Sequence, residues 1–201
     1  MSALIISGGD YAPYEGSPCG WAAACDRGYL YAEQMGIRPD LILGDFDSAP
    51  VPEDSDIPVE RYPVRKDDTD TLLAVKKALA LGHREITIAC AFGGRLDHTV
   101  ANLQAAAYAA EQKAFVRLQG LDTKAWVFRD RSVSFPRQEG YSLSVFSLTD
   151  TCTVSISGAE YACEELTVRN TFPIGVSNAW AAGEAAVTAK DGIVLVMACR
   201  L

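Results

Sequence analysis

Aspartates gather in four short clusters in the first half of this 201-residue chain. The clusters read Cys25-Asp26-Arg27-Gly28, Gly44-Asp45-Phe46-Asp47-Ser48, Asp67-Asp68-Thr69-Asp70 and Gly94-Arg95-Leu96-Asp97-His98. Aspartate is a poor helix and strand former and is rarely buried without a partner. Because Mg²⁺ prefers carboxylate oxygens and commonly shares them with substrate phosphates, the clusters predict a metal-dependent site for a phosphate compound.

The pair Asp45 and Asp47 directly follows an apolar run, residues 40–43, that we predict to be a strand. In open α/β sheets, ligands bind at the carboxyl ends of the strands. Two aspartates separated by one residue in a loop can turn both carboxylates toward one ion. The same residue types also build ordinary turns, so this pair alone leaves a metal site and a turn as equal alternatives. Phe46 is expected to be a buried anchor.

The third cluster opens a helix that the sequence predicts over residues 69–81. Asp68 or Thr69 is expected to cap this helix, since its N-terminus favours negative charge. Three carboxylates within four residues exceed what capping needs, and they repel one another unless a cation is near. We therefore expect Asp70 or Asp67 to face the metal. Lys66 either reaches a phosphate or offsets the acidic charge.

The fourth cluster lies between a predicted strand and a predicted helix. The planar guanidinium of Arg95 suits a phosphate. Asp97 either caps the helix or accepts a proton from a substrate hydroxyl. We expect His98 to be a surface or capping residue, and Asn102 could equally be a solvated helix residue. Asp26, in the first cluster, is either a helix cap or another ligand contact.

Strand and helix patterns alternate through the first half of the chain. Apolar runs predict strands over 3–7, 40–43 and 85–91, and periodic patterns predict helices over 26–35, 69–81 and 97–112. Gly8-Gly9 after the first strand could cradle phosphates through backbone amides. From residue 114 onward, short alternating runs separated by turn signals replace the helical periods. We expect an α/β domain over residues 1–122 with a mostly parallel sheet, followed by a small all-β sandwich over residues 123–201.

Composition and missing motifs exclude several classes of protein. With 18 basic and 26 acidic residues, the net charge of −8 argues against a nucleic-acid partner. No apolar run reaches the roughly 18 residues of a membrane span. The N-terminus has no signal-peptide pattern, and the six cysteines form no Cys-x-x-Cys pair, so we expect free thiols in a reducing cytoplasm and no zinc site. No phosphate-binding P-loop or Gly-x-Gly-x-x-Gly motif occurs, which disfavours P-loop kinases and dinucleotide dehydrogenases.

The order and spacing of the four clusters closely resemble the thiamine pyrophosphokinase (thiamine diphosphokinase) family. That family carries an Asp-x-Gly segment, a Pro-Asp-hydrophobic-Gly-Asp-Phe-Asp-Ser run, an Asp-x-Thr-Asp helix start and a Gly-x-Arg-x-Asp-His segment. The corresponding residues here are Asp26-Arg27-Gly28, Pro39 to Ser48, Asp67 to Asp70, and Gly94 to His98. The resemblance covers most of the chain, and the combination of clusters is far more specific than any one of them.

The β-rich half shares in the resemblance. Gly158-Ala159-Glu160-Tyr161 and Gly175-Val176-Ser177-Asn178 look like the two family segments that hold thiamine. An aromatic ring can stack on the flat, partly cationic rings of thiamine, although a packed strand tyrosine and an ordinary Ser-Asn turn are the commoner uses of such residues. The chain departs from the family at Ala179-Trp180, where bacterial relatives often have Glu, and at Arg27, where many have Gly.

The resemblance implies an enzyme that transfers pyrophosphate from ATP to the thiamine hydroxyl, giving AMP and thiamine diphosphate. It implies Mg²⁺ held by Asp45, Asp47 and Asp70, with Asp97 near the hydroxyl as the fourth catalytic residue. It assigns ATP and phosphate contacts to Asp26, Lys66, Asp67 and Arg95, and thiamine contacts to Tyr161, Ser177 and Asn178. It also implies a homodimer in which each active site combines the α/β domain of one chain with the β domain of the other.

Three alternatives share much of this pattern. A metal-dependent phosphohydrolase also uses aspartates and Mg²⁺. A binding module could hold thiamine diphosphate without turnover. A pyrophosphokinase for another alcohol would have the same metal-binding residues and would differ only in the region from Tyr161 to Asn178.

Overall fold

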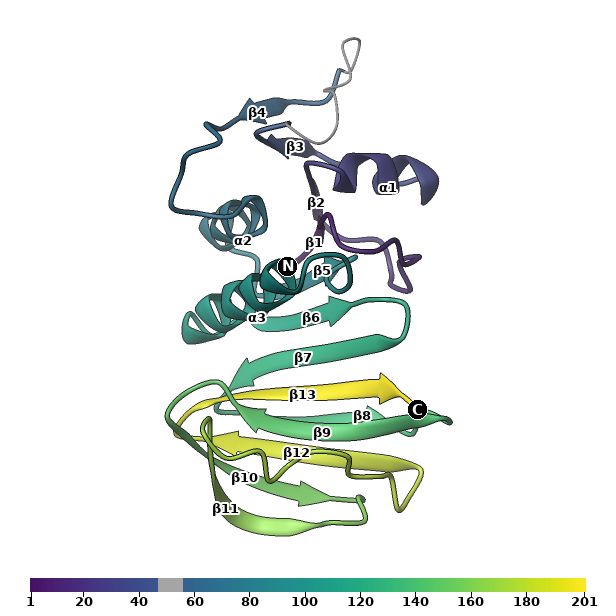
Figure 1. The fold of residues 1–201 in the computed structure, drawn as a ribbon, viewed down its shortest axis with the longest axis vertical. Coiled ribbons are helices and arrows are strands. Elements are labelled where there is room, and N and C mark those ends of the chain that lie inside the picture. Colours follow the sequence, from purple (N-terminus) through teal and green to yellow (C-terminus); the bar gives the residue numbers. More distant parts are fainter. Residues whose placement is uncertain (47–55) are drawn as a thin grey trace. The chain divides into compact units, whose positions relative to one another are not determined.

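The computed structural model describes residues 1–46 and 56–201, so the predicted site residue Asp47 lies outside the described part of the chain. The chain divides into two compact units: Met1–Ala109 with Val116–Leu121, and Ala110–Phe115 with Asp122–Leu201. Over the described residues the protein is mostly β, with three helices and a mixed sheet (Figure 1). None of the helices in these residues is long and apolar enough to cross a membrane.

Parallel strands form the framework of the first unit. They are β1 (Ser2–Ile6), β2 (Trp21–Cys25), β3 (Leu41–Gly44), β4 (Val59–Arg61) and β5 (Glu85–Ala89). β1 pairs in parallel with both β2 and β5, and β3 pairs in parallel with both β2 and β4. β6 (Phe115–Gln119) follows β5 in the strand order. Leu4, Ile5 and Ile6 are all buried, as is typical of a strand covered on both faces.

Three helices accompany these strands: α1 (Gly28–Gln34), α2 (Asp70–Ala80) and α3 (Leu96–Glu111). Ala32 of α1 packs in a cluster with Leu4 and Ile6 of β1. In Figure 1, α1 and α2 lie on opposite sides of the strands β1 and β2. A Cβ at Gly28 would overlap the carbonyl oxygen of Ile6, so glycine at this position allows α1 to begin close against β1.

The sequence predicts these helices well, with one boundary wrong. The predicted helix 69–81 is confirmed as α2, and Thr69 is its N-cap, because its Oγ1 accepts a hydrogen bond from the Leu72 amide at 3.2 Å. The predicted helix 97–112 appears as α3. The helix predicted from residue 26 begins instead at Gly28, since Asp26 has a left-handed φ of 46° and therefore lies outside the helix. Strands β2 and β4 had no strand prediction.

The second unit consists of antiparallel strands in two groups. β7 (Thr123–Arg129), β13 (Ile193–Arg200) and β9 (Tyr141–Ser147) pair in that order. β11 (Cys163–Arg169), β10 (Thr151–Ser157), β12 (Glu184–Lys190) and β8 (Ser132–Pro136) form the four-stranded sheet. Buried and exposed residues alternate along β10 and β12, which is the pattern of a sheet with one face in the core.

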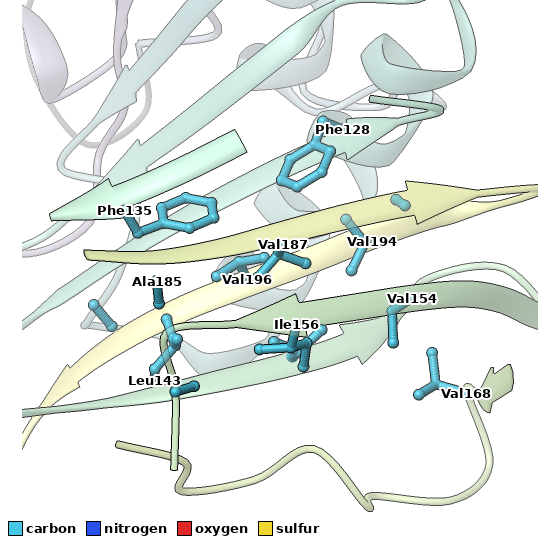
Figure 2. Close-up of a cluster of buried hydrophobic side chains, with 14 of the residues drawn as sticks. Phe128, Phe135, Leu143, Val154, Ile156, Val168, Ala185, Val187, Val194 and Val196 are labelled. Carbon is cyan, nitrogen blue, oxygen red and sulfur yellow. The ribbon is translucent and has the colours of Figure 1, made fainter. Parts of the chain in front are cut away.

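Side chains from both groups of strands form the core of this unit (Figure 2). Phe128 of β7 and Phe135 of β8 stack with their ring centroids 6.4 Å apart. Trp180 is 7% exposed, and its indole Nε1 donates a hydrogen bond to the carbonyl of Phe135 at 3.0 Å. Trp180, one of the departures from the family pattern, is therefore part of the core of this unit.

Candidate functional site

A cavity of about 520 Å³ opens in the first unit where the loops after its strands β1 to β5 meet the beginnings of α2 and α3. Parallel strands bring their carboxyl ends to one edge of a sheet, so loops that are distant in sequence converge there. The lining residues are Ser7, Gly8, Gly9, Cys25, Asp26, Arg27, Asp45, Val64, Lys66, Asp68, Thr69, Asp70, Thr71, Gly93, Gly94, Arg95, His98, Ala101 and Asn102. All four acidic clusters of the sequence contribute to this lining.

Three carboxylates of the cavity surround one ammonium group. Lys66 Nζ lies 2.7 Å from Oδ1 of Asp70 and 3.8 Å from Oδ2 of Asp45, and the side chains of these residues are only 14% exposed. Asp26 completes the group through a side-chain hydrogen bond with Asp70. Burial lowers the pKa of Lys66, but Asp70, Asp45 and Asp26 together outweigh it and raise that pKa above its usual value. Lys66 therefore stays charged.

Crowding among these carboxylates perturbs Asp26. Burial, followed by the hydrogen bond and the charge of Asp70, raises the pKa of Asp26 from 3.8 to about 7. The Phe46 amide, which donates to Asp26 Oδ1 at 3.2 Å, opposes this rise. Lys66 thus neutralises only part of the negative charge of Asp26, Asp45 and Asp70.

Backbone geometry places Asp26 in this position. Asp26 has a left-handed φ of 46°, which an aspartate tolerates at the end of a strand. Its amide donates to the carbonyl of Leu43 at 3.0 Å, which ties the end of β2 to β3. A Cβ at Gly44 would overlap the Asp26 carboxylate, so this carboxylate occupies space that only a glycine leaves open. Phe46 has a left-handed φ of 58°, which is unusual for a bulky residue and is more common at functional sites.

The donor atoms fit a hard divalent cation. Asp70 Oδ1 is buried and has no well-aligned hydrogen bond within the described residues, and the Lys66 ammonium lies beside it in the position of a cation. Mg²⁺ is commonly held by one or two protein carboxylates together with substrate phosphates. Within residues 1–46 and 56–201, no three His, Cys, Asp or Glu side chains are grouped closely enough to hold a metal by themselves. The described carboxylates thus fit a shared metal–phosphate site better than an all-protein cage.

Gly9, after β1, serves the close packing of two loops, and its amide is already bonded within the protein. The Gly9 amide donates to the carbonyl of Cys90 at 3.0 Å, so it is not available to the phosphate cradle that the sequence suggested. A Cβ at Gly9 would overlap the carbonyl oxygens of Phe92 and Cys90. Gly9 therefore allows two loops to pass in close contact, and Gly8 beside it lines the cavity without a side chain.

Only some of the residues at the start of α3 line the cavity. Arg95 and His98 line it, whereas Asp97 points instead to Arg95, whose guanidinium donates to both of its carboxylate oxygens. This bidentate contact holds the pKa of Asp97 below its usual value. Asp97 and Arg95 are both well exposed. His98, which the sequence suggested to be a surface or capping residue, is exposed and lines the cavity.

A buried polar network links three elements around the cavity, and sequence reasoning missed most of it. Ser7 Oγ and Thr71 Oγ1 lie 3.0 Å apart, and Asn102 Nδ2 donates to Ser7 Oγ at 3.4 Å and to the carbonyl of Ala91 at 2.8 Å. Asn102 is only 5% exposed, so it is not a solvated helix residue. The one available signal was the i+4 spacing of Asn102 from His98, which places both side chains on the same face of α3.

In the third cluster, Asp68 faces the cavity, where the sequence suggested Asp67 or Asp70, and Asp67 does not. Asp67 is exposed and does not belong to the cavity lining. Asp68 lines the cavity, and its Oδ2 forms an ion pair with Lys76 Nζ at 2.6 Å. Asp70 is at the first helical position of α2. Of the predicted phosphate contacts, Asp26, Lys66 and Arg95 therefore lie at the cavity.

The predicted thiamine residues all lie in the second unit. Tyr161 is 69% exposed, whereas Asn178 is 6% exposed. Asn178 Oδ1 accepts from the amide of Tyr161 at 2.9 Å and Nδ2 donates to the carbonyl of Tyr161 at 3.0 Å. Ser177 has a left-handed φ of 59°, and its amide donates to Ser144 Oγ at 3.1 Å. Asn178 therefore fixes the backbone that presents Tyr161.

Comparison with known proteins places this arrangement in a family. No curated protein matches the sequence significantly. The structure is similar to the thiamine pyrophosphokinase of Bacillus subtilis, with 20% identity, a TM-score of 0.88 and full coverage of both chains. It is also similar to that of Geobacillus thermodenitrificans, with 22% identity, a TM-score of 0.82 and coverage of 100% of this chain and 98% of the other. The enzyme of Candida albicans is 13% identical, with a TM-score of 0.77 and coverage of 100% and 89%.

These structural similarities are below 25% identity and establish the fold. The sequence itself matches the family model "Thiamin pyrophosphokinase, catalytic domain" over residues 17–118, just over half of the chain. That span includes the acidic cavity residues from Cys25 to Asn102. The chain therefore belongs to the thiamin pyrophosphokinase family.

Proposed function

We propose that this protein transfers the pyrophosphoryl group of ATP to the hydroxyl of thiamine, giving AMP and thiamine diphosphate. The hydroxyl oxygen attacks the β-phosphorus, the bond between the α–β bridging oxygen and that phosphorus breaks, AMP leaves, and the hydroxyl proton is released. The observation that carries the proposal is the cavity itself, in which carboxylates, Lys66 and Arg95 converge at the ends of parallel strands. The choice of thiamine rests on family membership.

The carboxylates would hold the metal ion that such a transfer requires. We propose that Asp45 and Asp70 bind Mg²⁺, together with Asp47, which lies outside the described residues. Asp26, hydrogen-bonded to Asp70, supports this pair. When bound, Mg²⁺ neutralises phosphate charge and orients the β-phosphoryl group. Lys66 and Arg95 would neutralise the remaining phosphate oxygens, and Asp67 remains a proposed outer phosphate contact.

Asp97 would act on the acceptor hydroxyl. An aspartate is ordinarily a carboxylate at neutral pH, so Asp97 can accept a hydrogen bond from the hydroxyl without retaining its proton. In the structure Arg95 occupies both carboxylate oxygens. We propose that phosphate binding draws the guanidinium away and leaves Asp97 to orient the hydroxyl. Catalysis then depends on positioning and charge neutralisation rather than on a covalent intermediate.

The second unit would supply the thiamine contacts. We propose that the exposed ring of Tyr161 stacks on thiamine and that Ser177 contributes a hydrogen bond. Asn178 is proposed as a positioning residue, because its amide is already bonded to the backbone of Tyr161. We further propose domains 1–122 for ATP and 123–201 for thiamine, and a homodimer in which each chain completes its partner's site.

A cytoplasmic location is also proposed, since all six cysteines are free thiols, which persist in reducing compartments. The acidic net charge fits a small-molecule enzyme without a nucleic-acid partner.

Thiamine dependence of AMP release tests the proposal. Purified protein with Mg²⁺ and ATP is expected to release AMP only when thiamine is present, and Asp70→Asn is expected to abolish that release. Asp56→Asn serves as the control, because Asp56 is an exposed partner of Arg38. Phosphate or AMP release without thiamine would instead indicate a phosphohydrolase. Binding of thiamine diphosphate without turnover would indicate a sensor, and turnover only with another alcohol would indicate a different pyrophosphokinase.

A further inference from the structure

The ammonium group of Lys66 lies between two carboxylates of the acidic cavity. Its ammonium contacts Asp70 Oδ1 at 2.7 Å and lies 3.8 Å from Asp45 Oδ2, within a pocket where all three side chains are 14% exposed. These two carboxylates are the described groups that we propose for Mg²⁺. The protein therefore places its own positive charge on the oxygens that the metal ion would use.

Two cations cannot share these oxygens at low cost. A divalent ion on Asp70 Oδ1 would lie within a few ångströms of the ammonium, and like charges repel strongly in a partly buried site. The Lys66 side chain can move, because its ammonium is carried by a flexible four-carbon chain. Its contact with Asp70 is an ion pair without well-aligned hydrogen bonds, since neither Nζ nor Oδ1 has such a bond within the described residues. The contact is therefore held by the attraction between opposite charges, which a divalent cation on the same oxygens can also supply.

We propose that Lys66 is an exchangeable internal counter-ion. In the empty enzyme it neutralises Asp45 and Asp70, and when the divalent cation arrives with a nucleotide it moves from these carboxylates to the phosphates. This inference rests on the proposed function, because that function brings the metal and the triphosphate to the same cavity. Metal ions alone bind weakly, since Lys66 then has no new anionic partner, whereas metal and nucleotide bind cooperatively.

Mn²⁺ binding to the nucleotide-free protein tests this role without any turnover. Lys66→Met removes the charge and keeps a similar side-chain length. It is expected to bind free Mn²⁺ roughly tenfold more tightly than the wild type in a calorimetric or electron paramagnetic resonance titration. Lys66→Arg keeps the charge and should bind Mn²⁺ as weakly as the wild type. Lys77→Met is the matched control, because Lys77 also forms an ion pair, 2.8 Å from Glu60, but does not line the cavity.

Cooperativity provides a second readout. With an ATP analogue whose α–β bridge is a methylene group, Mn²⁺ affinity should rise strongly in the wild type and much less in Lys66→Met. Circular dichroism checks that each variant is folded, and Lys66→Gln replaces Lys66→Met if the latter is not. Unchanged or weaker Mn²⁺ binding in the folded neutral variant would overturn the counter-ion role, even if wild-type AMP release still depends on thiamine. Loss of that dependence would instead overturn the proposed function, while the Mn²⁺ titration still decides the role of Lys66.

Discussion

Replacing Asp26 by Asn should stabilise the metal-free protein at alkaline pH. The pKa of Asp26 is raised from 3.8 to about 7, so the folded protein retains a proton that the unfolded chain has already lost. For a carboxyl group with a raised pKa, stability falls as pH rises from the unfolded pKa to the folded one. Asn cannot ionise. Its Oδ1 can still accept from the Phe46 amide, and its Nδ2 can donate to Asp70 in place of the shared proton.

The size of the effect follows from the shift in pKa. A difference of about 3 pKa units corresponds to about 4 kcal/mol, at about 1.4 kcal/mol per unit. Asp26 is only partly buried and lies at a cavity that solvent enters, so we reduce this to about 2 kcal/mol. The gain in unfolding free energy of Asp26→Asn over the wild type should be near zero at about pH 4 and should reach about 2 kcal/mol by about pH 8.

Urea denaturation followed by circular dichroism measures this gain at several pH values, with a chelator present to remove divalent cations. Asp56→Asn is the control, since its exposed ion pair with Arg38 should contribute little at any pH. A gain that is independent of pH, or a loss of stability at pH 8, would refute the reasoning about the carboxylate cluster.

Three further substitutions test separate parts of the structure. Gly44→Ala places a Cβ on the Asp26 carboxylate, so it should lower the unfolding free energy by about 1–3 kcal/mol in urea titrations; an unchanged midpoint would contradict the packing described here. Trp180→Phe removes the hydrogen bond to the Phe135 carbonyl and should cost about 1–3 kcal/mol in the same assay, whereas a neutral result would show that this bond contributes little. Asn178→Ala frees the backbone of Tyr161 and should raise the KM for thiamine several-fold with little change in kcat. A several-fold fall in kcat with an unchanged KM would contradict a positioning role.

Local signals in the sequence were sufficient to predict much of the fold. Thr69 caps α2 because its hydroxyl bonds within the same turn, and such a signal needs no tertiary structure. β2 was harder to predict, because Ala22, Ala23 and Ala24 have little strand preference of their own, and the strand forms through pairing with β1 and β3. β4 spans only Val59–Arg61 and pairs with β3, so it lacks a pattern long enough to recognise.

The candidate site shows the same division between local and long-range information. The aspartate clusters and Arg95 were recognisable from composition and spacing, and most of them line the cavity. The contact between Ser7 and Thr71 joins residues 64 positions apart, and it depends on the packing of α2 against β1, which no local pattern in the sequence reveals. Asp97 was expected at the substrate hydroxyl, but in the structure it pairs with Arg95, because this neighbour offers two aligned donors.

The identity of the products tests the central claim most directly. Phosphorus NMR of a reaction containing the protein, Mg²⁺, ATP and thiamine should show AMP and thiamine diphosphate formed in equal amounts, with neither appearing when thiamine is left out. Formation of ADP with thiamine monophosphate, or of free phosphate or pyrophosphate whether or not thiamine is present, would contradict transfer of the pyrophosphoryl group as a unit.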